Sequence, residues 1–237
     1  MKNTVLIYLF AALFLGVAFP ANASDKYHGA PRAVTLWWVI FNNPNACTAN
    51  PGGEEQCGSA DVFGQPFLDS VAIGSPDPSL ISPNTNAGLA VLYATGGVTD
   101  RNGRVDLIAS IYRTPDSGLN LTGPSVSDPM GLGVGFENPE AEVHLVVRDH
   151  GRRSREGRLL QVTNFLEPYC SDPNLMFFSG PNTCADIQFA VFGPSEAGED
   201  AVFAFGPTPK QVRRASATLI RNGDLIQAVV RTRVPKQ

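Results

Sequence analysis

Short apolar runs, interrupted again and again by glycine and proline, constrain the fold of this chain more than any other feature. The sequence holds 19 prolines and 23 glycines, and they separate runs in which apolar and polar residues alternate, such as residues 105–112. Helical periodicity is weak outside the first 23 residues, and short strands bounded by turn residues are typical of all-β folds. We therefore predict an antiparallel β-sandwich of Greek-key type, with long loops rich in proline, glycine and asparagine and a C-terminal β-hairpin.

Residues 33–41 are apolar on both faces, which predicts an interior strand covered on each side. Trp37 and Trp38 point to opposite faces of this strand, and we expect both in the core, although one of them could line a sugar or lipid groove. Short strands are also predicted at 61–63, 71–73, 159–165, 186–192 and 201–205.

Two Asn-Gly sequences between apolar runs predict β-hairpins. Asn102-Gly103 separates residues 89–95 from residues 105–112, and Asn222-Gly223 separates residues 215–220 from residues 225–231. The second hairpin is rich in basic residues, which predicts a sheet edge kept soluble by charge; these residues are Arg213, Arg214, Arg221, Arg231 and Arg233.

The N-terminus has the pattern of a secretory signal peptide. An apolar run at 5–19 is followed by Pro20 and by the small-residue sequence Ala21-Asn22-Ala23, which predicts cleavage after Ala23. We expect a signal peptide at 1–23, a β-sandwich domain at 24–206 and a β-hairpin at 207–237 packed on that domain. No later segment is long and apolar enough to cross a membrane, so a secreted or periplasmic protein is predicted. The net charge of -4 argues against nucleic acid as a partner.

Four cysteines form an even set in a chain with a predicted leader, which favours disulfides. Three pairings are possible. We favour Cys47 with Cys57 and Cys170 with Cys184, because each pair brackets a short loop and short loops close most easily. A four-cysteine zinc site is the weaker alternative, because the sequence has no CxxC spacing.

Residues 141–151 combine a strand pattern with two of the three histidines in the chain. Period-two alternation places Glu142, His144 and Arg148 on one face, where Glu142 and His144 could share a divalent metal such as copper or zinc. His150 could join them only if the chain folded back at Gly151. A solvated sheet face with a cross-strand ion pair is the favoured alternative.

The turn at 148–158 gathers arginines that could bind a phosphate, a sulfate or an acidic glycan; the candidates are Arg148, Arg152, Arg153 and Arg155. An exposed hairpin tip is the favoured alternative. The sequence has no G-x-S-x-G motif, and paired cysteines would leave no thiol nucleophile, so the chain is expected to be non-catalytic rather than an enzyme.

Three segments, WWVIFNNP with the two loop cysteines after it, AEVHLVVRDHG and CADIQFAVF, together resemble a family of uncharacterised secreted bacterial proteins. The resemblance covers most of residues 34–193 and implies export, disulfides and a β-rich domain. A second resemblance is to the chordin-type domain, and through it to the copper-zinc superoxide dismutase sandwich. This chain lacks the His-x-His pair of that sandwich, so its metal set does not carry over.

These patterns favour an exported, disulfide-stabilised β-sandwich that acts as a non-catalytic binding or envelope-associated module. Two alternatives stay open at this point. One is a metal-binding, possibly redox-active protein that uses Glu142, His144 and His150. The other is an anion-binding or glycan-binding surface at 148–158.

Overall fold

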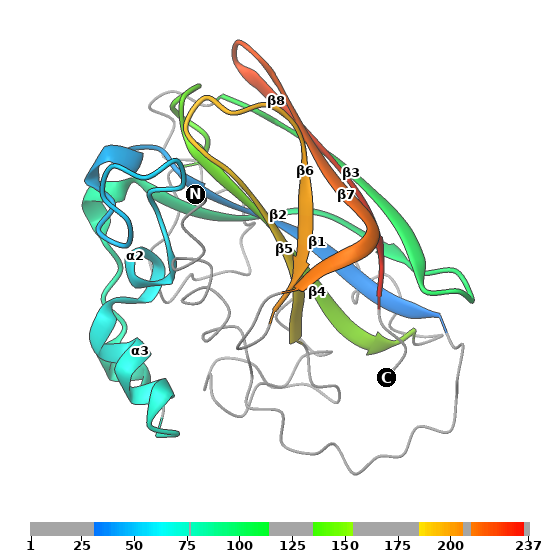
Figure 1. Cartoon of the computed structure of the whole chain (residues 1–237), viewed down its shortest axis with the longest axis horizontal. Helices are drawn as coiled ribbons and strands as arrows, with labels where there is room; N and C mark the ends of the chain where they lie inside the picture. Colours follow the sequence, from blue (N-terminus) through cyan, green and yellow to red (C-terminus); the bar gives the residue numbers. More distant parts are fainter. Residues whose placement is uncertain (1–30, 76, 114–134, 154–184, 206–209, 235–237) are drawn as a thin grey trace.

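The computed structural model describes residues 31–75, 77–113, 135–153, 185–205 and 210–234, and eight strands in these ranges form one sheet (Figure 1). The strand order is β2-β1-β4-β5-β6-β7-β8-β3, and each neighbouring pair is antiparallel. The prediction of an antiparallel all-β fold is confirmed. The strands are β1 (Arg32–Phe41), β2 (Leu89–Val98), β3 (Arg104–Tyr112), β4 (Glu142–Arg152), β5 (Ala185–Phe192), β6 (Gly198–Ala204), β7 (Lys210–Asn222) and β8 (Leu225–Arg233).

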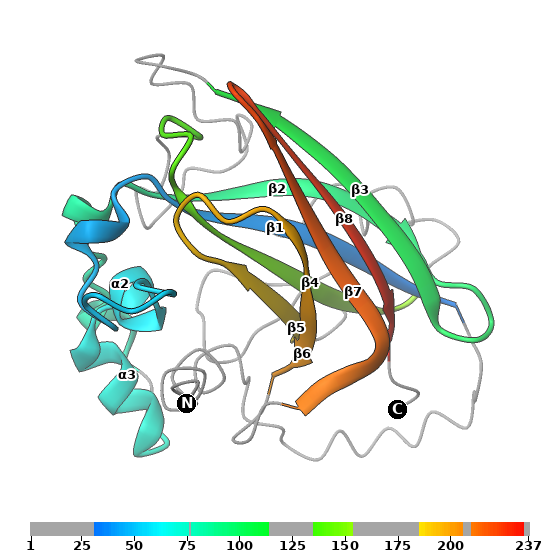
Figure 2. The same ribbon diagram turned by 45° about the horizontal axis from the view of Figure 1, so that its top comes forward.

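The sheet curls until its two outermost strands, β2 and β3, lie against each other (Figures 1 and 2). Gly97 of β2 lies at this contact, because a Cβ atom there would be 3.1 Å from side-chain atoms of both Val105 and Leu107. The missing side chain lets β3 pack directly over the backbone of β2. The two layers expected of a sandwich are therefore the two halves of one nearly closed sheet.

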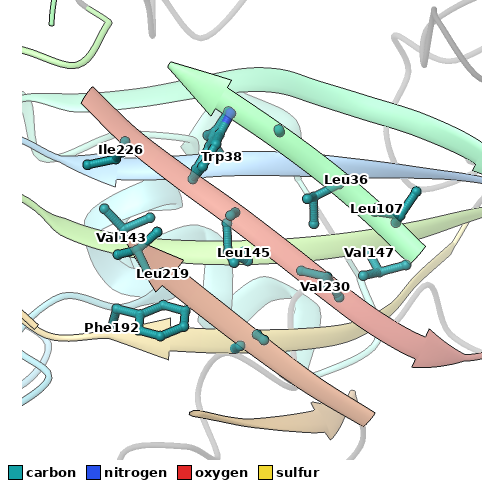
Figure 3. Close-up of a cluster of buried hydrophobic side chains, with 14 of the residues drawn as sticks. Leu36, Trp38, Leu107, Val143, Leu145, Val147, Phe192, Leu219, Ile226 and Val230 are labelled. Atoms are coloured by element: carbon teal, nitrogen blue, oxygen red, sulfur yellow. The ribbon is translucent and has the colours of Figure 1, made fainter. Parts of the chain in front are cut away.

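The main core lies between these two halves (Figure 3). β3 shows the predicted alternation, since Val105, Leu107, Ala109 and Ile111 are buried and their neighbours are exposed. Burial of such side chains contributes about 25 cal/mol for each Å² removed from water, which makes this interface the main source of stability. The residues that meet across it include Leu36, Trp38, Val143, Leu145, Val147 and Phe192 from one half and Leu107, Leu219, Ile226 and Val230 from the other.

A second core covers the opposite face of β1 and β4. The segment between β1 and β2 forms this cover, and Val62, Phe63 and Phe67 from it pack in the same cluster as Trp37. Trp37 is 5% exposed and Trp38 is 1% exposed, so the prediction that both tryptophans are core residues is confirmed. The helical elements of the cover are η1 (Pro44–Ala46), α2 (Ser59–Phe63), α3 (Gln65–Ala72), η2 (Pro78–Leu80) and η3 (Thr85–Ala87).

The strands predicted at 61–63 and 71–73 are wrong, because residues 61–63 lie in α2 and residues 71–73 form the end of α3 and the start of the turn after it. Asp61 shows why the helix begins where it does. Its buried carboxylate accepts hydrogen bonds from the amides of Gly58 at 3.0 Å and Thr48 at 2.7 Å, which satisfies backbone groups that a strand would have paired elsewhere. Segments of three residues are too short to distinguish a helix from a strand by periodicity.

The two Asn-Gly sequences behave differently. The turn at Asn102-Gly103 forms, but the strands that it joins are not paired with each other, because β2 pairs with β1 and β3 pairs with β8. The first predicted hairpin is therefore wrong in its pairing. β7 and β8 do form the second hairpin, with Asn222 opposite Leu225. Both strands lie inside the sheet, so the predicted basic sheet edge is also wrong.

Three predictions fall outside the described residues: the signal peptide with its cleavage after Ala23, the strand at 159–165, and the pairing of Cys170 with Cys184. Within the described ranges, none of the helices has the length and apolar character needed to span a membrane. The C-terminal strands β7 and β8 belong to the same sheet as the strands before them.

Candidate functional site

Glu142 and His144 lie together under the disulfide loop rather than on a solvated face. Both side chains are buried, and Nε2 of His144 lies 2.6 Å from Oε1 of Glu142. The Glu142 carboxylate also accepts the amide protons of Gln56 at 2.6 Å and Cys57 at 3.0 Å. The pair therefore holds the loop closed by the Cys47–Cys57 disulfide, with its S–S bond of 2.02 Å, against β4. The solvated face expected here is wrong.

His150 lies at the other end of β4. Its Nε2 is 2.8 Å from the hydroxyl of Thr35, which also accepts a hydrogen bond from the indole N–H of Trp37 at 2.8 Å. Burial, assisted by the nearby charge of Arg148, lowers the pKa of His150 to about 3, so the imidazole is neutral at physiological pH.

The three predicted metal ligands are not brought to one point. β4 continues through Gly151 to Arg152, so the chain does not fold back and His150 stays at the far end of the strand from Glu142 and His144. Across the ranges that the structure describes, no group of three or more His, Cys, Asp or Glu side chains is placed to hold a metal ion. The chemistry that these residues show is hydrogen bonding between segments.

The predicted arginine surface at 148–158 is divided between different roles. Arg148 donates to both carboxylate oxygens of Asp186, at 2.6 and 2.9 Å, in a partly buried ion pair. Arg152 and Arg153 are exposed at the end of β4, and Arg155 lies outside the described residues. Because its guanidinium is held by Asp186, Arg148 is not available to an external anion.

A different group of arginines lines a cleft of about 530 Å³, which we call the arginine cleft. Its floor is built by β3 and β8, where Arg104 stands opposite Arg233 and Asp106 stands opposite Arg231. These residues alternate with buried ones, so their side chains lie on the outer face of the sheet. The lining residues are Arg104, Asp106, Arg213, Arg214, Arg231, Thr232 and Arg233.

A bulge in β7 supplies the wall of the cleft. Ala201 of β6 is opposite Ser216, and Phe203 is opposite Gln211. Residues 212–215 of β7 therefore lie opposite a single residue of β6, Val202. Figure 2 shows the bend of β7 at its N-terminal part. Arg214 within the bulge has φ of 62°, a left-handed conformation that costs free energy for a residue other than glycine. The bulge directs Arg213 and Arg214 into the cleft.

The arginine cleft has a strong excess of positive charge. Five arginines line it against one carboxylate, that of Asp106. Arg233 donates from Nε to the carbonyl of Asn102 at 2.8 Å, and within the described part of the chain none of the five arginines forms an ion pair. Guanidinium groups present paired donors that match the oxygens of phosphate, sulfate and carboxylate.

Fold and site together define an all-β protein with an outward-facing cationic cleft. The chain matches no protein-family model, and the searches of curated proteins and of solved structures found no match either. The resemblance drawn from the sequence stays a prediction, and the function has to be argued from the site.

Sequence reasoning recognised part of this site but not its form. It identified the arginines of β7 and β8 as a basic group, but it missed Arg104 and Asp106 because the pairing of β3 with β8 joins residues far apart in the chain. It also grouped Arg221 with them, whereas Arg221 donates to the carbonyls of Pro139 and Ala141 and so holds the start of β4.

Proposed function

We propose that this chain is an exported, non-catalytic binding protein whose ligand is an anion held in the arginine cleft. The observation that carries the proposal is the gathering of five arginines, from three strands, around a single aspartate. Like charges repel one another in the free protein, so this arrangement lowers stability unless an anion compensates it. The left-handed backbone at Arg214 adds a second local cost at the same place.

Binding rather than catalysis is supported by Thr232, the one hydroxyl-bearing residue among those that line the cleft. Thr232 is buried, and its Oγ1 donates to Oε1 of Gln188. That hydrogen bond engages the Thr232 proton inside the fold and points the hydroxyl away from a ligand. The cleft then offers fixed cations that recognise charge and geometry, which is the chemistry of a phosphate, sulfate or acidic-glycan binder.

Export is supported by the Cys47–Cys57 disulfide, since such bonds persist in oxidising compartments. The signal-peptide pattern of residues 1–23 points the same way. N-terminal sequencing of the protein recovered from outside the cytoplasm is expected to begin at Ser24. A chain that keeps residues 1–23, or that is found reduced in the cytoplasm, would contradict export.

The test of the binding proposal compares two double variants that remove the same charge from different places. We expect Arg213→Ala/Arg231→Ala to weaken binding of soluble polyphosphate and dextran sulfate about tenfold or more, and to flatten its dependence on salt. Arg152→Ala/Arg153→Ala, on the surface predicted from sequence, is expected to change binding about twofold or less. Titration calorimetry at several salt concentrations measures both.

A third variant is expected to strengthen binding rather than weaken it. Asp106→Asn removes the carboxylate of the cleft without changing its size, so it is expected to strengthen polyphosphate binding by about threefold to tenfold. If the two double variants weaken binding equally, or if Asp106→Asn has no effect, the arginine cleft is not the binding site.

A further inference from the structure

We propose that the outer face of β3, β8 and β7 docks on an anionic phospholipid surface, with the arginine cleft on the headgroup phosphates and an adjoining apolar strip in the interfacial layer. The inference rests on the proposed anion-binding function and specifies where the anion comes from. It is carried by the register of the three strands and by the exposure of their side chains.

The register places the apolar strip directly beside the cleft. After the row in which Asp106 stands opposite Arg231, the next outward row has Ile108 opposite Val229. Rows on one face of a sheet are about 6.8 Å apart, so the apolar side chains begin one row away from the arginines. We define the apolar strip as Ile108, Tyr112, Ile220, Leu225 and Val229, in which Tyr112 stands opposite Leu225 and Ile220 lies diagonal to both Leu225 and Val229. The row between its two ends holds the polar pair Ser110 and Gln227, with Ile220 opposite Gln227.

Three residues of the strip are exposed and Leu225 and Val229 are partly exposed, although the same strands bury every alternate residue. Ile108 is 64% exposed, Tyr112 is 67% exposed and Ile220 is 46% exposed. The described helices α2 and α3 lie on the other side of the fold, away from β3, β8 and β7 (Figures 1 and 2). Large apolar side chains gathered on one sheet face mark a surface that meets a partner.

The charges along this face are uneven. At the end of the strip farthest from the cleft, Arg113 is paired with Asp224 at 3.3 Å, so its charge is compensated. Among the described residues, the arginines of this face that form no ion pair are therefore concentrated at the cleft end. A molecule with this distribution would lie with the arginines toward the phosphates and the strip alongside them.

A phospholipid surface would contact both the arginine cleft and the apolar strip, whereas each of the other partners considered would suit only one of them. An acidic glycan would satisfy the arginines and leave Ile108 and Tyr112 in water. A second copy of the chain could cover the strip but would bring another set of arginines close to the first. Anionic headgroups attract basic clusters, and the interfacial layer accepts aliphatic side chains and favours tyrosine, whose ring is apolar and whose hydroxyl is polar.

The test measures cosedimentation of the full mature protein with vesicles of phosphatidylglycerol and phosphatidylcholine, and with phosphatidylcholine alone. We expect binding to the anionic vesicles only. Ile108→Ser/Tyr112→Ser is expected to weaken that binding about tenfold while leaving soluble polyphosphate binding unchanged. Arg213→Ala/Arg231→Ala is expected to weaken both. Ile73→Ser is the matched control, because Ile73 is 80% exposed and follows α3 rather than lying on β3.

The outcomes separate this inference from the function on which it rests. Polyphosphate binding without vesicle binding overturns lipid docking and leaves the anion-binding proposal in place. If the wild type binds neither polyphosphate nor anionic vesicles, the anion-binding proposal and the lipid-docking proposal are both overturned. Vesicle binding that Ile108→Ser/Tyr112→Ser does not weaken shows adsorption by charge alone and overturns the role of the strip. A wild-type dimer that this variant dissociates shows that a second copy occupies the face.

Discussion

Glu142, Asp149 and Arg148 are polar residues of one central strand, and each fastens another segment to it. Glu142 holds the disulfide loop through the amides of residues 56 and 57. Asp149 forms an ion pair with Arg32 of β1, in which Oδ2 of Asp149 lies 2.6 Å from Nη2 of Arg32. Arg148 forms an ion pair with Asp186 of β5. Removing one partner of a fully buried pair leaves the other uncompensated and costs about 3 to 5 kcal/mol, and the cost is smaller for these pairs because their arginines are partly exposed. These residues stabilise the scaffold on which the arginine cleft is built.

His150 gives the protein a dependence of stability on pH. Its pKa is about 3 in the folded state and about 6.5 in the unfolded state, so the unfolded chain binds more protons between these values. Stability therefore falls as the pH is lowered through about 6.5. Between pH 7 and pH 5 the loss from this residue is about 2 kcal/mol. Urea unfolding at the two pH values measures it.

His150→Gln can keep a hydrogen bond to Thr35 but cannot take up a proton in this range. The difference in unfolding free energy between pH 7 and pH 5 is expected to be about 2 kcal/mol smaller in the variant than in the wild type. Burial raises the pKa of Glu55, which gives a slope of the opposite sign in both proteins, so only the difference between them is diagnostic. Equal pH dependence in the two proteins would contradict the neutral, buried imidazole.

At the scale of elements, a glycine lies where the sheet closes on itself. Gly97 allows β3 to cross the backbone of β2 at the place where the sheet meets itself. A methyl group there would be 3.1 Å from Val105 and from Leu107, closer than ordinary packing. The neighbours would have to move apart, and the contact between the two halves of the sheet would loosen.

Gly97→Ala and Gly97→Val test this contact in graded form. We expect Gly97→Ala to lower the free energy of unfolding by about 1 kcal/mol and Gly97→Val by about 2 to 3 kcal/mol, because overpacking increases with side-chain volume. Amide hydrogen exchange is expected to quicken in β2 and β3 and to stay unchanged in β4. An unaltered exchange pattern with an unaltered midpoint in urea would show that closure does not depend on this position.

Local patterns predicted the strands well and their partners poorly. Alternation at 105–112 and the two-sided apolar run at 33–41 identified β3 and β1, because burial periodicity is a local property. The pairing at Asn102-Gly103 failed because a tight turn fixes the direction of the chain and not its hydrogen-bond partner. The sequence did not reveal the arginine cleft for the same reason, since Arg104 and Arg233 meet only through long-range pairing.

At the scale of the whole molecule, the segment between β1 and β2 covers the outer face of the sheet at β1 and β4. Its disulfide loop brings Cys57 onto Glu142. Sequence alternation placed Glu142 and His144 on one face correctly but could not show that 42–88 returns to cover it. The arginine cleft lies on the outer face of β3, β8 and β7, away from the described helices α2 and α3.

The pairing of β3 with β8 also sets the order in which the protein can assemble. A strand completed by residue 112 finds its partner only when residues 225–233 are available, so the ladder that adds β3 to the edge of the sheet is among the last to form. Such high contact order slows folding. Under the export that we propose for this chain, the delay is an advantage, because β3 cannot pair with β8 before the C-terminal residues have crossed the membrane.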